Sequence, residues 1–270
     1  MLALLAGSGG LPAVLVEGLD RAGAEAPHIC ALEGFLPDGV TPERTFLLET
    51  LGSLIEDLCA RGVTEVCFAG AMQRYPIDPA RIDAATMPLV PVIQRALTDS
   101  DDNGLKAVIA VFENAGLRVV GAHQLLPELL PPEGVATVAQ PSARDRRDAD
   151  RADAILRAMS AADIGQSVAV KSGQALAVEG IFGTDWMLGS LRARPDMAQA
   201  GGIFFKAPKQ GQDRRVDLPT IGPGTVAGVV AAGLSGLVIE AGGVMVLERA
   251  AVARACDAAG LFLWVRGAPA

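Results

Sequence analysis

Residues 1–33 read MLALLAGSGGLPAVLVEGLDRAGAEAPHICALE, and this stretch decides the fold. The apolar run Leu2–Ala6 predicts a strand, and the glycine loop Gly7–Pro12 follows it. Pro12–Ala22 carries apolar side chains at helical spacing, and His28–Leu32 is a second short apolar run. A strand, a glycine turn, a helix and a second strand in this order predict parallel strands with helices packed against them.

The same alternation continues along the first half of the chain and indicates an N-terminal Rossmann-like domain. Further elements are expected as strands at Thr45–Glu49, Glu65–Ala69 and Leu117–Gly121, and as helices at Leu51–Arg61, Pro88–Leu97 and Gly104–Ala115. The turn-rich segment Leu129–Gly134 then separates residues 1–130 from residues 134–270. The second half again mixes helices with strands, and Ser172-Gly173 predicts an antiparallel hairpin. We therefore expect two α/β domains, the second with a mixed sheet.

The composition argues against several classes of protein. Half of the residues are apolar and only a fifth are charged, unlike a disordered chain. The net charge of −8 argues against a nucleic-acid-binding protein, because such proteins need a basic surface. The N-terminus lacks the cationic start of a signal peptide. Glycines and Pro223 interrupt the uncharged segment Leu218–Ile239, which predicts a helix followed by a strand and not a membrane span.

The four cysteines are dispersed and match no zinc-binding spacing. We expect them to be small buried side chains of a cytoplasmic protein in a reducing compartment: Cys30, Cys59, Cys67 and Cys256.

The glycine loop is a candidate phosphate-binding site. Gly9 and Gly10 let backbone N–H groups approach a ligand, and the N-terminus of the following helix favours negative charge. The dinucleotide-binding fingerprint has a small residue where Pro12 stands, so the match is partial. Glu33, at the end of the second strand, could hold a ribose hydroxyl group as in a Rossmann protein. A tight turn without a ligand explains the same glycines equally well.

The densest group of charged residues lies in Lys206–Thr225, which reads KAPKQGQDRRVDLPTIGPGT. Four cations fall within ten residues of an otherwise acidic chain, and glycine and proline keep the segment out of a regular helix. The cations can neutralise a diphosphate, and Asp213 or Asp217 can hold a hard divalent cation. Thr220 and the N–H groups at the start of the next helix add donors to phosphate oxygens. The alternative is an exposed basic loop paired with surface acids.

This segment, extended by Val226, resembles the signature of the UDP-2,3-diacylglucosamine pyrophosphatases of the non-calcineurin type, which act in lipid A biosynthesis. Other stretches resemble the family in the same order along the chain: GSGGLP at Gly7–Pro12, FAGAMQR at Phe68–Arg74, SDDNGL at Ser100–Leu105, GAHQLLPELLPPEG at Gly121–Gly134, AVEGIFGTDWML at Ala177–Leu188, and the run Gly236–Glu248. The resemblance spans nearly the whole chain. Ser8 and the pair Met72-Gln73 depart from the residues usual in the family.

The resemblance implies a hydrolase that splits UDP-2,3-diacylglucosamine into lipid X and UMP by attack of water on the phosphorus attached to the sugar. It also implies Mg²⁺ as cofactor, a ligand cleft between the domains, a homodimer, and peripheral contact with the inner membrane of a Gram-negative bacterium. Asp217 matches the family's essential acidic residue, as catalytic residue and metal ligand, and Asp213 is a second candidate metal ligand. The candidate substrate-binding residues are Gly9, Gly10, Leu11, Pro12, Gly70, His123, Lys171, Thr184, Asp185, Lys206, Lys209 and Thr220.

Two other functions fit parts of the sequence. A nicotinamide-dependent oxidoreductase would use the glycine loop and Glu33, and a non-catalytic nucleotide-sugar-binding protein would bind the ligand without releasing UMP. His123 could be a structural histidine, and Asp101 and Asp102 could cap the following helix instead of contacting a metal. The sequence contains neither a P-loop nor the nucleophile motif of the serine hydrolases.

Overall fold

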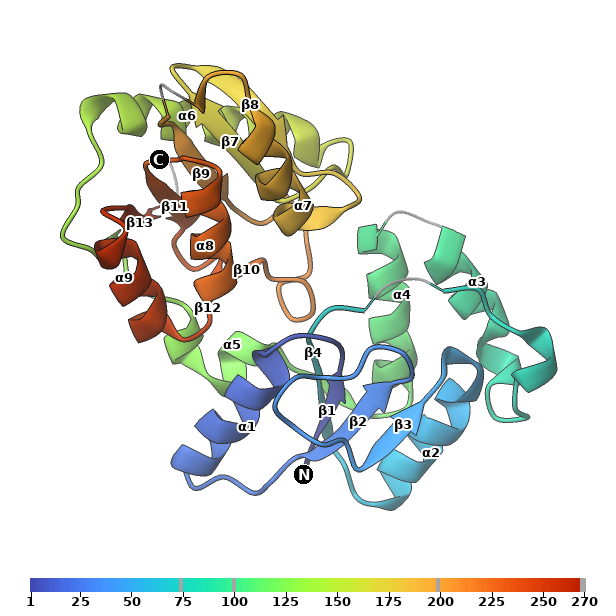
Figure 1. Ribbon diagram of the computed structural model, residues 1–270. Coiled ribbons are helices and arrows are strands. Elements are labelled where there is room, and N and C mark those ends of the chain that lie inside the picture. Colours follow the sequence, from blue (N-terminus) through green and yellow to red (C-terminus); the bar gives the residue numbers. More distant parts are fainter. Residues whose placement is uncertain (73–74, 99–100, 198–199, 268–270) are drawn as a thin grey trace. The chain divides into compact units, whose positions relative to one another are not determined.

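The protein forms two compact units in the computed structural model (Figure 1), which describes residues 1–72, 75–98, 101–197 and 200–267. The N-terminal unit consists of Met1–Pro127 and Asp213–Asp217, and the C-terminal unit consists of Glu128–Gln212 and Leu218–Ala270. The short segment Asp213–Asp217 therefore lies in the second half of the sequence and packs with the first half. The sequence predicts two continuous domains and gives no sign that Asp213–Asp217 belongs to the N-terminal unit.

The N-terminal unit is built on a five-stranded parallel sheet. Its strands are β1 (Leu2–Ala6), β2 (His28–Leu32), β3 (Arg44–Phe46), β4 (Glu65–Ala69) and β5 (Arg118–Val119). They pair in the order β3-β2-β1-β4-β5, and every pair is parallel. The helices are α1 (Leu11–Arg21), α2 (Leu51–Ala60), α3 (Val90–Thr98), α4 (Asp101–Asn114) and α5 (Ala122–Leu125), with 3-10 turns η1 (Leu48–Thr50), η2 (Pro79–Arg81) and η3 (Met87–Leu89). The predicted Rossmann-like sheet is confirmed.

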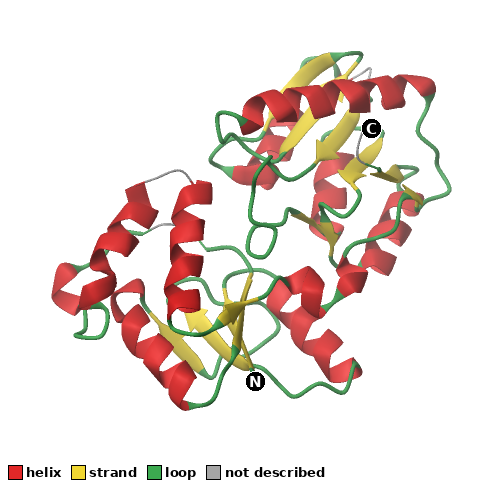
Figure 2. Cartoon of the chain, turned by 180° about the vertical axis from the view of Figure 1, so that it is seen from behind, coloured by secondary structure: helices red, strands yellow, loops and turns green. Residues whose placement is uncertain are grey.

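Alternation along the strands decides which helices cover each face of this sheet. Ala3 and Leu5 share one face of β1 and belong to the same core as Leu54 of α2 and Phe112 of α4, and each of these side chains is at most 1% exposed. Figures 1 and 2 show α1 and α5 on the side of the sheet away from α2 and α4. Both faces are therefore covered, which explains why the strands read as continuous apolar runs.

The C-terminal unit is built on a six-stranded mixed sheet in the order β6-β13-β11-β9-β7-β8. Its strands are β6 (Gly134–Val135), β7 (Ser167–Lys171), β8 (Gln174–Val178), β9 (Ile203–Lys206), β11 (Gly236–Glu240) and β13 (Phe262–Arg266), and a separate parallel pair joins β10 (Thr220–Ile221) to β12 (Met245–Val246). The central strands β9, β11 and β13 are parallel, and β6, β7 and β8 pair antiparallel. The helices are α6 (Ala143–Ser160), α7 (Gly183–Ser190), α8 (Pro223–Ala231) and α9 (Arg249–Ala258), with the 3-10 turn η5 (Leu191–Ala193). The 3-10 turn η4 (Pro127–Leu129) lies at the boundary between the two units in the sequence.

Two local predictions in this half are confirmed. Ser172 and Gly173 join β7 to β8 with φ angles of 51° and 78°, the left-handed conformation that a two-residue hairpin turn requires. The uncharged segment Leu218–Ile239 forms β10, α8 and most of β11, as its glycine and proline residues predict. Within the described residues, no helix is both long enough and apolar enough to span a membrane.

Two other predictions are wrong. The strand expected at Thr45–Glu49 ends at Phe46, because Glu49 lies in η1, where its carboxylate accepts hydrogen bonds from the Tyr75 hydroxyl (3.2 Å) and the backbone N–H of Asp78 (2.9 Å). Cys59 was expected to be buried, but it lies on the exposed side of α2. The remaining cysteines are buried as expected: Cys30, Cys67 and Cys256.

Candidate functional site

In the N-terminal unit, the candidate site residues gather at the carboxyl edge of the parallel sheet. The glycine loop leaves β1 at this edge, Gly70 follows β4, and Gly121 follows β5. These three strands are neighbours, and the winding of the sheet changes direction between β1 and β4, because β2 lies on the other side of β1. In open α/β sheets, ligands bind outside the carboxyl ends of the strands at such a switch point.

The glycine loop can contact a ligand through its backbone N–H groups and not through side chains. Gly10 is the N-cap residue of α1, and the structure describes no side chain that caps this helix end. Leu11 and Pro12 are buried, so their side chains fix the start of the helix and face away from solvent. Gly9 has a φ of 95°, which a residue with a Cβ atom rarely adopts. The loop thus offers uncapped N–H groups at a helix N-terminus, where an anion is favoured.

Gly70 holds the glycine loop against the loop that follows β4. The Ser8 N–H donates to the Ala71 carbonyl oxygen (2.9 Å), and the Ala71 N–H donates to the Ser8 carbonyl oxygen (2.8 Å). A Cβ atom on Gly70 would lie 2.5 Å from the Gly7 carbonyl oxygen, and the φ of Gly70 is 99°. Only glycine fits this position, so the structure gives Gly70 a supporting role in shaping the loop.

His123 lies in α5, directly after β5. Its ring folds over Gly121, where an added Cβ atom would approach the His123 Cε1 atom to 2.6 Å. The Nδ1 atom is buried and has no hydrogen-bond partner among the described residues. Burial lowers the pKa of His123, and the positive charge of Arg214 lowers it further. The imidazole is therefore neutral at pH 7.

The segment Asp213–Asp217 is attached to the N-terminal unit by charge and by apolar contact. Arg215 Nη1 donates to Glu113 Oε1 of α4 (2.6 Å), and Arg215 Nη2 donates to Asp213 Oδ2 (2.7 Å). The hydrogen bonds from Arg215 lower the pKa of the Asp213 carboxyl group. Val216 packs against the core of the N-terminal unit. Arginine and glutamate thus fix the segment next to Gly121, whose added Cβ atom would lie 3.1 Å from the Arg215 Cα atom.

The chain returns to the C-terminal unit at Leu218, so Asp217 is the last residue of this segment. Its backbone N–H donates to the Asp213 carbonyl oxygen (3.2 Å), and its side chain is half-buried. This hydrogen bond closes a turn that begins at Asp213 and ends at Asp217, the two candidate metal ligands. Asp213 is ion-paired with Arg215, and the family resemblance seen in the sequence marks Asp217 as the essential carboxylate.

In the C-terminal unit, Lys206 and Thr184 form the clearest candidate anion site. Lys206 ends β9 and is only 7% exposed, and its Nζ atom donates to the Thr184 hydroxyl group (2.8 Å). Thr184 and the exposed Asp185 lie in the first turn of α7, where the helix dipole favours an anion. A cation beside a hydroxyl group and a helix N-terminus suits a phosphate oxygen.

The other predicted substrate-binding residues of this unit also have protein partners. Lys209 forms an ion pair with Asp163, and Lys171 forms one with Asp196. Thr220 donates from its hydroxyl group to the Leu218 carbonyl oxygen (3.3 Å). Their roles as substrate ligands stay predictions.

The candidate carboxylates suit a magnesium ion that is shared with the substrate. Among the residues that the structure describes, no three His, Cys, Asp or Glu side chains are grouped so that they could hold a metal ion. Mg²⁺ is commonly bound by one or two carboxylates together with substrate phosphates and water. Asp217, with Asp213 beside it, fits this pattern and does not fit a metal cage made by protein alone.

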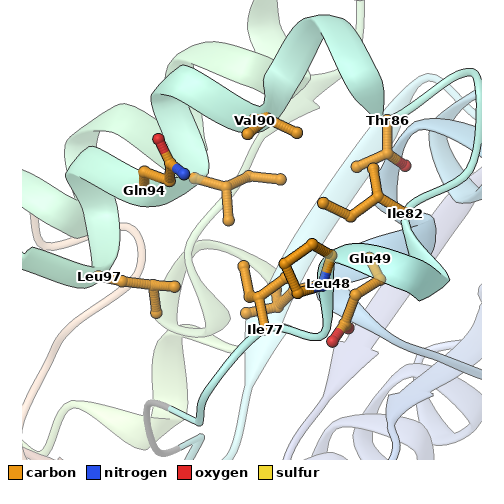
Figure 3. Close-up of a pocket in the computed structure, with 10 residues that line it drawn as sticks. Leu48, Glu49, Ile77, Ile82, Thr86, Val90, Gln94 and Leu97 are labelled. Atoms are coloured by element: carbon orange, nitrogen blue, oxygen red, sulfur yellow. The ribbon is translucent and has the colours of Figure 1, made fainter.

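Some of the sequence-based candidates lie outside the described residues: Gln73 and Arg74 of FAGAMQR, Ser100 of SDDNGL, and the side chains of Asp101 and Asp102. Sequence reasoning in turn missed Glu113, because nothing in the pattern of α4 marks it as the partner of an arginine 102 residues away. It also missed an apolar pocket beside α3 (Figure 3), whose lining comes from several short separate elements.

Comparison with known proteins agrees with the resemblance found in the sequence. Residues 1–129 match the family described as LpxI N-terminal domain, and residues 132–264 match the family described as LpxI C-terminal domain. The chain is also similar to a protein of Caulobacter vibrioides named UDP-2,3-diacylglucosamine pyrophosphatase LpxI. The two are 35% identical over 269 residues, which covers 97% of this chain and 96% of the relative.

Proposed function

Since the chain belongs to the LpxI family, we propose that it hydrolyses the diphosphate of UDP-2,3-diacylglucosamine in lipid A biosynthesis. The observation that carries this proposal is the 35% identity to the Caulobacter vibrioides pyrophosphatase, which covers 97% of this chain and therefore extends over both units. The products are UMP and 2,3-diacylglucosamine 1-phosphate, also called lipid X.

In the proposed reaction, the oxygen of a water molecule forms a bond to the phosphorus attached to the sugar. The bond between this phosphorus and the bridging oxygen breaks, UMP leaves with the bridging oxygen, and the attacking water releases a proton to the surrounding solvent. Negative charge develops on the phosphoryl oxygens, and fixed cations and N–H groups stabilise it. Lys206 with Thr184, and the N–H groups of Gly9 and Gly10, are the groups proposed to bind the phosphates.

Asp217 is the proposed catalytic residue. We infer that its carboxylate orients the attacking water or holds a magnesium ion that is shared with the diphosphate. When bound, Mg²⁺ would polarise a phosphoryl oxygen and neutralise part of the charge of the diphosphate. Asp213 adds negative charge in the same turn, and its ion pair with Arg215 fixes the backbone that carries Asp217. Asp213 is thus proposed to position Asp217 as well as to support the metal.

The setting of the enzyme is also a proposal. The substrate carries two acyl chains, so we infer that a cytoplasmic enzyme meets it at the inner membrane through peripheral contact. A homodimer is expected from the family resemblance alone. Size-exclusion chromatography with light scattering tests the dimer, and sedimentation with anionic vesicles tests the membrane contact.

The proposed reaction is tested by incubating the protein with UDP-2,3-diacylglucosamine in ¹⁸O-labelled water and analysing the products by mass spectrometry. We expect UMP without label and lipid X with one ¹⁸O atom in its phosphate. Excess EDTA should stop the reaction, and added Mg²⁺ should restore it. Label in UMP would contradict the site of attack, and undiminished turnover in EDTA would contradict the metal.

The same assay separates the two alternative functions. A nucleotide-sugar-binding protein would bind the substrate and release no UMP. An oxidoreductase would change the fluorescence of NADH on binding, through the glycine loop and the exposed Glu33 at the end of β2. We expect UMP release and no response to NADH.

A further inference from the structure

An apolar pocket lies within the N-terminal unit, beside α3 (Figure 3). Its volume is about 180 Å³, and its apolar lining includes Leu48, Ile77, Ile82, Val90, Ile93 and Leu97. Val90, Ile93 and Leu97 are spaced three and four residues apart, so they share one face of α3. An apolar cavity of about 150 Å³ is large enough to bind benzene, so this pocket has room for a hydrocarbon segment of about six carbons.

The buried polar side chains of the lining are already engaged within the protein. The Glu49 carboxylate accepts hydrogen bonds from Tyr75 and from the backbone of Asp78. The Thr86 hydroxyl oxygen accepts a hydrogen bond from the Gly52 N–H (2.8 Å). A polar ligand would therefore find few partners inside the pocket, whereas a hydrocarbon would leave all of these hydrogen bonds intact.

The pocket continues toward the end of α3. A second hollow shares Gln94 and Leu97 with it and adds Arg95 and Thr98. Gln94 and Arg95 are exposed, so the apolar interior opens toward polar and cationic side chains. A ligand that is long and apolar at one end and anionic at the other matches this distribution of surface.

We infer that the pocket beside α3 binds a fatty-acyl chain of the substrate. The inference rests on the proposed function, which supplies a substrate with two acyl chains and a diphosphate. The acyl chain lies along the apolar face of α3, and Arg95 is placed at the open end, where the polar part of the ligand begins. The pocket makes chain length a determinant of specificity, because each methylene group buried in an apolar pocket strengthens binding.

The test uses two changes in the pocket and one control outside it. Val90→Trp fills the pocket from α3, where Val90 is half-buried, and Leu97→Gln makes its wall polar. Val138→Trp is the control, because Val138 is 85% exposed and belongs to the other unit. For each protein, kcat/KM is measured with UDP-2,3-diacylglucosamine that carries either long or four-carbon acyl chains, and the melting temperature is recorded.

We expect both pocket variants to lower kcat/KM for the long-chain substrate by about tenfold or more, and to change it for the short-chain substrate by less than about twofold. The control should keep the wild-type ratio of kcat/KM for the long-chain substrate to kcat/KM for the short-chain substrate. An unchanged ratio in either pocket variant that melts within a few degrees of the wild-type protein would overturn the inference.

Binding of a fluorescent long-chain fatty acid gives a second readout that does not depend on turnover. We expect the wild-type protein and Val138→Trp to bind it alike, and Val90→Trp to bind about tenfold more weakly. If the wild-type protein binds the fatty acid but releases no UMP, the proposed function fails while the pocket is retained as a hydrocarbon site. If it hydrolyses the substrate with no dependence on chain length, the acyl inference fails while the proposed function stands.

Discussion

The contact between Gly70 and the glycine loop can be tested by Gly70→Ala. The alanine Cβ atom would lie 2.5 Å from the Gly7 carbonyl oxygen and 2.8 Å from the Ser8 carbonyl oxygen, so backbone must move. The backbone that moves is the loop proposed to bind phosphate. The change therefore disturbs the geometry of the candidate site through a residue that does not itself need to touch the substrate.

The expected loss of stability has two parts. A residue with a Cβ atom at a φ of 99° costs about 1–2 kcal/mol relative to glycine. Overpacking against backbone adds about 1–3 kcal/mol. The total of about 2–5 kcal/mol corresponds to a fall in the melting temperature on the order of 4–20 °C, at about 2–4 °C for each kcal/mol.

Gly62→Ala is the matched control. Gly62 follows α2, has a φ of 80°, and would place an added Cβ atom with no atom within 4 Å. It carries the conformational cost of about 1–2 kcal/mol without the steric contact. Chemical denaturation and kcat/KM for UDP-2,3-diacylglucosamine are measured for both variants, below the temperature at which either begins to unfold.

We expect Gly70→Ala to be less stable than Gly62→Ala and to lose about tenfold or more in kcat/KM, because displacing catalytic groups by a fraction of an ångström is costly. Gly62→Ala should retain the wild-type kcat/KM. Equal losses of stability in the two variants would refute the steric argument. A normal kcat/KM for Gly70→Ala would refute the role of the glycine loop.

Two further predictions concern the cysteines and the charged turn. Cys59 is exposed and should react rapidly with a thiol reagent under native conditions. The three buried thiols should react only on unfolding, and burial raises the pKa of one of them, Cys67, to about 12. Fast labelling of more than one cysteine, counted by mass spectrometry, would contradict this prediction. Arg215 lowers the pKa of Asp213, so their pairing should stabilise the fold by about 1 kcal/mol above pH ~4 and lose this contribution as the pH falls through the folded-state pKa. Urea unfolding of wild-type protein and Asp213→Asn should therefore differ at pH 7, and the difference should shrink as the pH falls below about 4; a constant difference down to the acid limit of folding would contradict the pairing.

Local sequence patterns were sufficient for the elements that build the sheets. The run from β1 to β2 was predictable because each strand is buried on both faces and the glycine loop marks the turn between β1 and α1. The strand expected at Thr45–Glu49 failed because hydrogen bonds from Tyr75 and Asp78 to Glu49 favour a 3-10 turn. Those partners lie 26 and 29 residues away, beyond the reach of a local pattern.

The candidate site was predictable in its residue types and not in its contacts. Lys206–Thr220 stood out as a cationic segment, but charge density alone could not tell that Lys209 would pair with Asp163 or Arg215 with Glu113. The contacts of Asp213–Asp217 with the N-terminal unit could not be predicted from the sequence either. Val216 packs against the core of the N-terminal unit, and the sequence around it offers no local sign of this.

The measurement that tests the central claim most directly is the initial rate of UMP release from UDP-2,3-diacylglucosamine by the wild-type protein and by Asp217→Asn. Loss of a charge interaction worth about 4 kcal/mol in the transition state would slow the reaction about a thousandfold. The melting temperature should stay within a few degrees of the wild-type value, because asparagine has nearly the same shape as aspartate and keeps the backbone N–H that donates to the Asp213 carbonyl oxygen. We predict rapid UMP release by the wild-type protein and almost none by the folded variant. UMP release by Asp217→Asn at the wild-type rate would contradict the account.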